Sequence, residues 1–214
     1  MSEAYLEHEF QYSSARHQSE TAISGMWLFL ATEVLFFGAL FLTWVYSRHF
    51  NTAGFDEGAK HTDLLIGSVN TAILITSSFV YYTGLNFIEK GRVRGLIVCC
   101  IITLLLGLAF MVLKFGMEWR DDFDKHMFPG PDFAITGPNR GGAMLFYVFY
   151  FISTMLHGAH LLVGIALVTW ILVRAWRGVY DRMHYTGVEV VGIYWSFVDV
   201  IWLVLYPLIY LVGR

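Results

Sequence analysis

Five ionisable side chains lie inside or at the edge of long apolar runs of the sequence, where they could do chemistry. They are three acids and two histidines: Glu33, His157, His160, Glu189 and Asp199. An ionised aspartate near the centre of a membrane-spanning helix costs roughly 2.5–3.5 kcal/mol on insertion scales, so such residues are usually paired. Two interpretations are open. The side chains could be hydrogen-bonded within a helix bundle, or they could form a proton path, a metal site or a lipid-headgroup site.

His157 and His160 are three positions apart, a spacing at which two imidazoles of one helix can bind a metal ion. A haem held between helices needs histidines on two facing helices, and the other apolar runs contain none. A di-iron carboxylate bundle needs Glu-x-x-His pairs on two helices, together with further glutamates. No nucleotide-binding or nucleophile-elbow motif occurs either. We therefore expect no metal, no cofactor and no catalytic residue in this chain.

The composition places these residues in a membrane. Of the 214 residues, 57% are hydrophobic and only 14% are charged, against about 25% charged in soluble domains. Too few polar groups remain to cover a globule of this size in water. The net charge of −3 without a basic run argues against nucleic acid as a partner.

Runs with few charges predict five membrane-spanning helices. A span needs about 20 mostly apolar residues, and the runs do not alternate as transmembrane strands do. The predicted fold is an all-α, five-helix polytopic bundle over residues 21–214, after a polar tail over residues 1–20. The helices are expected at about 22–48, 64–88, 94–116, 142–174 and 187–212.

Polar and small residues recur at helical spacing in three of these helices, which predicts polar seams between helices. The seams contain Asn70, Ser77, Tyr81 and Gly84; Ser153, His157, His160 and Gly164; and Glu189, Gly192, Ser196 and Asp199. Counted along the helices, Glu33, His157 and Asp199 lie near the middle of the membrane, where a carboxylate–imidazole contact is possible. Glu189 lies at the interface.

The short second and fourth connections are densely basic, which favours a cytoplasmic N-terminus. They contain Lys90, Arg92 and Arg94, and Arg174, Arg177 and Arg182.

Four segments resemble, in order, those of subunit III of haem-copper terminal oxidases, the cytochrome c oxidase subunit 3 family. They are GMWLFLATEVLFFGALF (25–41), SVNTAILITSS (68–78), HGAHLLVG (157–164) and VEVVGIYWSFVDVIWLVLY (188–206). Ser196 stands where many members have histidine, and Phe115 where many have glutamine three residues before Glu118. The five helices match the shorter, bacterial form of the family.

The resemblance implies a non-catalytic core subunit that binds subunit I and phospholipid. It places Glu33, His157, His160, Glu189 and Asp199 among the buried polar positions related to lipid or proton uptake. Asn70, Ser77, Trp195 and Trp202 would be packing residues. Haem and copper would lie in the partner subunits I and II of a proton-pumping complex that reduces oxygen to water in aerobic respiration. That complex would lie in a bacterial cytoplasmic membrane.

Several alternatives stay open. The electron donor could be cytochrome c or quinol, and a respiratory supercomplex is a further candidate partner. The chain could instead be a subunit III-like component associated with nitric oxide reductase. A protein of another class, an independent membrane carrier, would act without an oxidase partner, but no pair of broken helices supports one.

Overall fold

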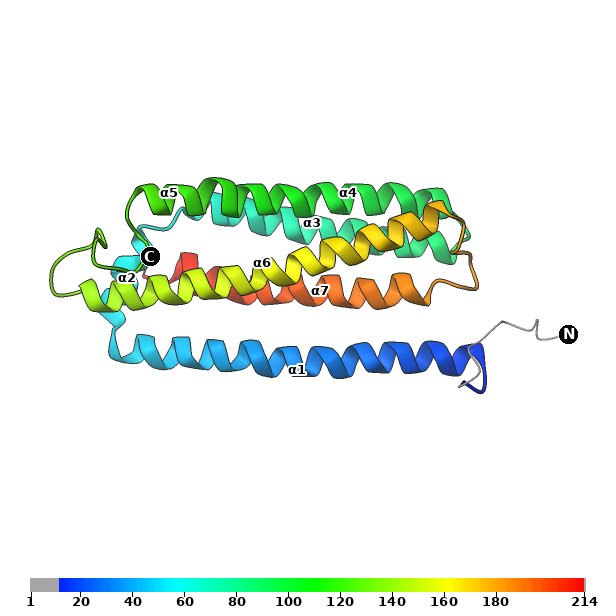
Figure 1. Cartoon of the computed structure of the whole chain (residues 1–214), viewed down its shortest axis with the longest axis horizontal. Coiled ribbons are helices and arrows are strands. Elements are labelled where there is room, and N and C mark those ends of the chain that lie inside the picture. The colour runs from blue at the N-terminus through cyan, green and yellow to red at the C-terminus, as the bar shows by residue number, and fades with distance from the viewer. Residues whose placement is uncertain (1–11, 214) are drawn as a thin grey trace, which may run out of the picture.

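A computed structural model of the chain describes residues 12–213, and within that range it contains helices and no strand (Figure 1). The elements in chain order are α1 (Ala15–Phe50), α2 (Thr52–Lys60), α3 (Leu64–Glu89), α4 (Val93–Met111), the π-helix η1 (Val112–Glu118), α5 (Trp119–Asp124), α6 (Arg140–Trp176), α7 (Thr186–Tyr206) and the π-helix η2 (Pro207–Leu211). Five continuous helical segments are long and apolar enough to cross a membrane. The predicted all-α bundle of five spans is confirmed.

Two spans begin or end outside their expected limits. α1 begins at Ala15 rather than at 22, because the Ser14 hydroxyl caps it by accepting a hydrogen bond from the His17 amide at 3.1 Å. Residues 1–11 of the expected tail lie outside the described residues. The third span continues through η1 and α5 to Asp124 instead of ending near 116. Its extension carries charged residues that are buried inside the bundle.

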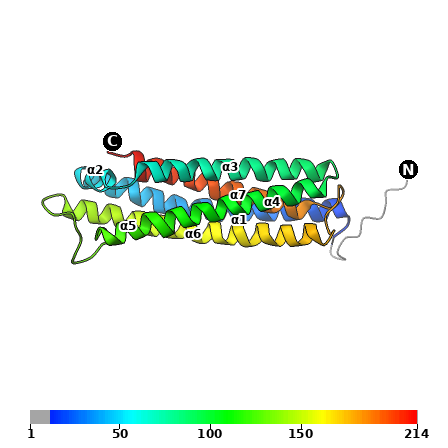
Figure 2. The same cartoon turned by 90° about the horizontal axis from the view of Figure 1, so that it is seen from above.

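The short helix α2 was not expected from the sequence. It packs on the start of α6 (Figure 2), where Gly54 meets Gly142 so closely that a Cβ on Gly54 would lie 2.4 Å from the Gly142 Cα. Phe55 is fully buried and meets the Phe146 ring edge-to-face at a centroid distance of 5.9 Å. The missing side chains at the two glycines let the helices touch, and Phe55 anchors α2.

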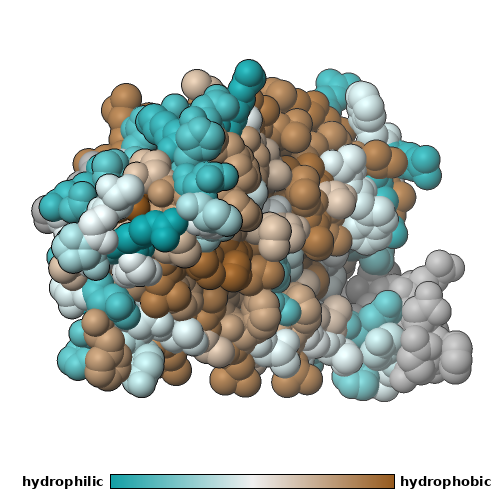
Figure 3. Space-filling view, turned by 60° about the vertical axis from the view of Figure 1, so that its left-hand side comes forward, coloured by the Kyte–Doolittle hydropathy of each residue, from teal (hydrophilic) through white to brown (hydrophobic). Residues whose placement is uncertain are grey.

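The helix α1 lies along one side of the bundle, against α6 and α7 (Figure 1). Only 17% of the most apolar stretch of α1 is buried within this chain, whereas 61% of the corresponding stretch of α7 is buried. α7 is therefore the central helix and α1 the most peripheral. Hydrophobic side chains cover broad areas of the surface between groups of hydrophilic ones (Figure 3), as expected for a protein surrounded by lipid or apolar subunits.

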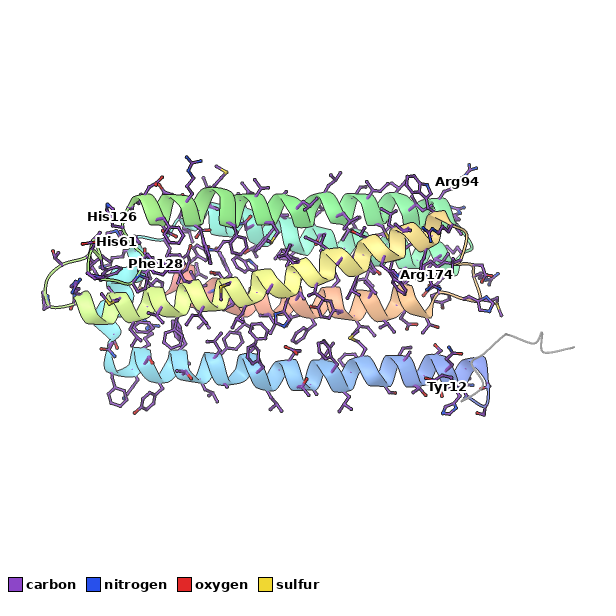
Figure 4. The ribbon with its side chains drawn as sticks, viewed as in Figure 1. Tyr12, His61, Arg94, His126, Phe128 and Arg174 are labelled. Atoms are coloured by element: carbon purple, nitrogen blue, oxygen red, sulfur yellow. The ribbon has the colours of Figure 1, made fainter. Side chains whose placement is uncertain are left out.

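The two ends of the bundle differ in their side chains (Figure 4). One end, here called the Arg174 end, carries Arg174 together with Arg94 and Tyr12. The other end, the loop end, carries His61, His126 and Phe128 and includes α2 and the connection over residues 125–139.

Candidate functional site

Glu33, the acid near the middle of α1, is paired with His160 of α6. One Glu33 carboxylate oxygen lies 3.1 Å from Nε2 of His160, and both side chains are about one-fifth exposed. The other ring nitrogen, Nδ1, lies 2.8 Å from the carbonyl oxygen of Leu156. The ring of Phe37 meets the imidazole edge-on at 5.1 Å. Counting along the helices placed His157 near the depth of Glu33 without choosing a partner for that acid, and in the structure the partner is His160.

The contacts of His160 fix the number of protons that the pair holds. A carbonyl oxygen only accepts hydrogen bonds, so Nδ1 of His160 carries a hydrogen and donates it to Leu156. The contact between Nε2 and Glu33 needs a second hydrogen, which lies either on the imidazole or on the carboxyl group. The two side chains therefore hold two such hydrogens, one of which lies in the contact between α1 and α6.

His157 has a different environment from His160, one turn away. It is 1% exposed, and neither of its ring nitrogens has a hydrogen-bond partner among the described residues. Its ring lies 5.5 Å from that of Phe110 and 5.0 Å from that of Trp202, by centroids. His157 is thus a neutral core residue packed among aromatic rings.

Two of the expected polar stripes, on α3 and α7, meet in the structure and are joined by hydrogen bonds near the middle of both helices. The Ser78 hydroxyl donates to Oδ2 of Asp199 at 2.5 Å. The indole N–H of Trp195 donates to the Ser77 hydroxyl at 3.1 Å, and that of Trp202 donates to the Thr71 hydroxyl at 3.0 Å. Such interhelical bonds hold membrane helices in register, because no water competes for the polar groups.

Two expected seam residues keep polar atoms without a partner. Asn70 is fully buried, and neither its amide nitrogen nor its oxygen has a partner among the described residues. Oδ1 of Asp199 is also buried and unpartnered within the described part of the chain. Both residues therefore lie in the seam, as expected, but their hydrogen-bonding capacity is not fully used.

The Arg174 end has a hollow of about 680 Å³. Among the residues that line it are Arg16 of α1, Arg174, Tyr180 and Glu189. The Arg174 guanidinium lies over the ring of Trp170 at 4.7 Å, and its buried Nε has no partner among the described residues. The Tyr180 hydroxyl is also buried and unpartnered there, and burial raises the pKa of that phenol. The guanidinium groups of Arg16 and Arg174 bring positive charge to this hollow, so it could accept an anionic group.

The connection between α6 and α7 forms one wall of this hollow. Asp181 accepts hydrogen bonds from the backbone amides of Met183 and His184 at 2.7 and 2.8 Å. The amide of Met183, followed by the His184 side chain, holds the pKa of Asp181 below its usual range. The ionised carboxylate therefore shapes the turn that leads into α7.

An apolar groove runs beside α1 on the side facing α3 and α7. It has a volume of about 680 Å³ and is lined by residues that include Trp27 and Val34 of α1, Tyr82 of α3 and Phe197 of α7. Its lining is almost entirely apolar, so it suits a hydrocarbon chain.

The chain is similar to known proteins along nearly its whole length. Residues 6–214 match the family described as cytochrome c oxidase subunit III. The chain belongs to this family. A cytochrome c oxidase subunit 3 from Thermostichus vulcanus is 31% identical over 207 residues, which cover 94% of this chain and 92% of the relative. The quinol oxidase subunit 3 of Bacillus subtilis is 27% identical, with 98% of this chain and 97% of the relative covered.

In one relative, the sequence similar to this chain is part of a longer protein named as two oxidase subunits. The heme-copper oxidase subunit I+III of Aeropyrum pernix is 27% identical over 195 residues, which cover 88% of this chain but 22% of the fused protein. As a member of the subunit III family, the chain is a component of a haem-copper oxidase complex, of the cytochrome c or quinol type, and associates with other oxidase subunits.

The subunit III chain offers no convergent metal ligands in the part that the structure describes. Residues 12–213 contain no group of three or more His, Cys, Asp or Glu side chains that could hold an ion. His157 and His160 face different surroundings, aromatic rings in one case and Glu33 in the other. Their spacing therefore does not produce a shared ligand set.

Sequence reasoning missed a cluster of buried charges in the third span. Lys114 is fully buried, and Glu118 and Asp122 are 3% and 5% exposed. In the sequence, Lys114 marks the end of an uncharged run, and Asp122 falls in the expected loop. The available signal was the spacing of Lys114, Glu118 and Asp122, at intervals of four residues, which places all three on one face of a helix.

Proposed function

We propose that this chain is the non-catalytic core subunit III of a proton-pumping haem-copper terminal oxidase, where it stabilises subunit I. Oxygen reduction to water in aerobic respiration would take place at haem and copper in the partner subunits. The fused relative supports this most directly, because a polypeptide named as subunits I and III holds the two sequences next to each other. The complex would lie in a bacterial cytoplasmic membrane, with subunit II as a further partner and the N-terminus of this chain in the cytoplasm.

The geometry supports a stabilising role. The mid-membrane polar groups of Glu33, His160, Ser78 and Asp199 are used to join helices of this chain to one another. The peripheral position of α1 leaves much of its apolar surface uncovered within the chain. An apolar partner subunit or lipid is therefore needed to cover it in the membrane.

Affinity purification of the tagged chain from its own membranes tests the proposal. We expect it to retain a polytopic partner with the haem spectrum of an oxidase, and mass spectrometry would identify subunits I and II. Glu33→Gln should reduce the yield of that complex. Transport by the chain reconstituted alone, or a purified complex with a nitric oxide reductase in place of an oxidase, would contradict the proposal.

We also propose that the chain binds phospholipid along α1. The Arg174 guanidinium, which lines the hollow, would bind the phosphate at the Arg174 end. The groove lined by Trp27, Val34 and Phe197 would hold an acyl chain. An arginine suits a phosphate because its N–H groups form a planar fork.

The lipid proposal is tested by native mass spectrometry of the purified complex. Arg174→Gln should lose one bound phospholipid relative to the unsubstituted complex. Arg177→Gln is the matched control, because Arg177 is exposed at the same end but does not line the hollow. Equal lipid counts in the two variants would remove the case for a phosphate site at Arg174.

A further inference from the structure

Five polar side chains form a buried cluster near the loop end of the bundle, here called the Lys114 cluster. They come from four neighbouring helical segments: Lys114 and Glu118 from η1, Asp122 from α5, Tyr150 from α6 and Tyr210 from η2. The two π-helical segments of the described chain therefore supply three of the five residues. π-helical turns inside α-helices occur frequently at functional sites.

The ammonium group of Lys114 is surrounded by oxygen atoms and aromatic rings. Its Nζ lies 2.7 Å from the Tyr210 hydroxyl, 3.1 Å from the Tyr150 hydroxyl and 2.9 Å from Oε1 of Glu118. The same nitrogen lies 4.4 Å from the centre of the Tyr150 ring and 5.7 Å from that of Trp202. These contacts compensate the charge of the cation at a fully buried position.

The tyrosines connect this cation to two carboxyl groups. The Tyr210 hydroxyl donates to Oε1 of Glu118 at 2.6 Å, so its single hydrogen is used. The Tyr150 oxygen lies 3.0 Å from Oε1 of Glu118 and 2.7 Å from Oδ2 of Asp122. Tyr150 therefore bridges the two carboxyl groups.

Counting hydrogens shows that the bridge is one proton short when both carboxyl groups are ionised. The Tyr150 hydroxyl carries one hydrogen, and an ionised carboxylate only accepts. With both acids ionised, one of the two contacts would bring unprotonated oxygens together at hydrogen-bonding distance. A single added proton completes both contacts: a neutral Asp122 donates to the Tyr150 oxygen while Tyr150 donates to Glu118. The reverse arrangement, with Glu118 neutral, is equally complete.

Glu118 offers a second indication that the site takes a proton. Its other oxygen, Oε2, is buried and has no partner among the described residues, although the residue is 3% exposed. Fully ionised, the cluster would hold one cation and two anions. One proton brings it to zero net charge, which a site removed from water favours.

We propose that the Lys114 cluster is a proton-binding site that takes one proton from the loop end and shares it between Asp122 and Glu118 through Tyr150. Asp122 is the entry, because it belongs to the last turns of the span and keeps 5% of its surface exposed. In the transfer, the proton of Asp122 passes to the Tyr150 oxygen while the hydroxyl hydrogen of Tyr150 passes to Oε1 of Glu118. Asp122 becomes a carboxylate and Glu118 a neutral acid, while Tyr150 is neutral before and after and the net charge of the cluster does not change.

Other titratable groups also act on the cluster electrostatically. They are Asp121 and Lys125 beyond the end of η1, Tyr147 and His157 on α6, and Asp63 before α3. Asp121 is exposed and forms an ion pair with Lys125 at 2.5 Å. It is therefore a suitable control for a charge change near the cluster that does not touch the bridge.

Infrared difference spectroscopy of the purified oxidase complex, with pH changes applied to a hydrated film, tests the proposal. The carbonyl stretch of a protonated carboxyl group is the signal. We expect Asp122→Asn and Glu118→Gln each to alter the frequency of one and the same band, whereas Asp121→Asn changes only the pH at which that band appears. If either variant leaves the band intact, the shared site does not exist.

Tyr150→Phe keeps the ring against Lys114 and removes only the bridging hydroxyl, so it tests the sharing even if a carboxyl variant fails to assemble. In that variant the proton should stay on one acid. Labelling with ¹³C-aspartate or ¹³C-glutamate should then shift the pH-sensitive band with one label only, whereas both labels shift it in the unsubstituted complex. Unchanged label sensitivity in Tyr150→Phe would overturn the bridging role.

Discussion

The pair of Glu33 and His160 is expected to contribute measurably to holding α1 on the bundle. Hydrogen bonds involving a charged group contribute about 1.5–3 kcal/mol in soluble proteins. Interhelical hydrogen bonds in membranes average only about 0.6 kcal/mol, with a maximum near 1.7 kcal/mol. Because the pair is about four-fifths buried, we expect a coupling energy of about 1 kcal/mol, or roughly fivefold in the folding equilibrium.

A double-mutant cycle measures this coupling. Glu33→Ala and His160→Phe are made singly and together, and the free energy of unfolding of the full chain is measured in mixed micelles. Phenylalanine keeps an aromatic ring against Phe37. Glu33→Gln should cost less than Glu33→Ala, because a glutamine amide can still donate to Nε2 of a neutral imidazole.

The matched control is Thr32→Val, also on α1. Among the residues that the structure describes, the Thr32 hydroxyl is bonded within its own helix, to the carbonyl of Phe29 at 2.6 Å. Its effect should therefore add to that of His160→Phe without coupling. A coupling energy for Glu33 and His160 no larger than this control, or equal costs for Glu33→Gln and Glu33→Ala, would refute the reasoning.

Three further predictions concern packing, the seam and pH. Gly54→Ala should lower the free energy of unfolding by about 1–3 kcal/mol, because the added Cβ would meet the backbone of α6. Gly38→Ala is the control, because its Cβ meets open space, and it should leave the thermal stability of the protein unchanged or raise it. Trp195→Phe should cost about 2 kcal/mol in denaturant unfolding, because it leaves a cavity and removes the bond to Ser77. Folding lowers the pKa of Asp181. The α6–α7 turn should therefore be fully protected from hydrogen exchange above about pH 4 and should lose protection as the pH falls through the lowered pKa. The variant Asp181→Asn should abolish this pH dependence.

The spans themselves could be predicted from the sequence because lipid imposes a simple rule. A segment must satisfy its own backbone and stay apolar for about 20 residues. The same rule hid the continuation of the third span beyond residue 116. Lys114 and Glu118 appear as the end of an apolar run, and only the partners Tyr150 and Tyr210, distant in the sequence, make their burial possible.

The site residues were predicted less completely, since a helical stripe gives a face but not a partner. Helical spacing placed Asp199 on a polar face of its helix, but it could choose neither α3 as the facing helix nor Ser78 as the donor. Depth along the helix could not distinguish His157 from His160, which lie one turn apart. The choice depends on which side of α6 faces α1, and that is set by packing of the whole bundle. The helix α2 was missed because nine residues with two glycines give too weak a signal.

The distance in sequence between Glu33 and its partner has a consequence for biogenesis. His160 follows 127 residues later, so at roughly 5–20 residues per second the ribosome needs about 6–25 s to deliver it. During that interval α1 can already be in the bilayer, and an unpaired carboxylate there is costly. Glu33 therefore has no histidine partner from this chain while α1 is inserted, and closure of the pair marks the arrival of α6.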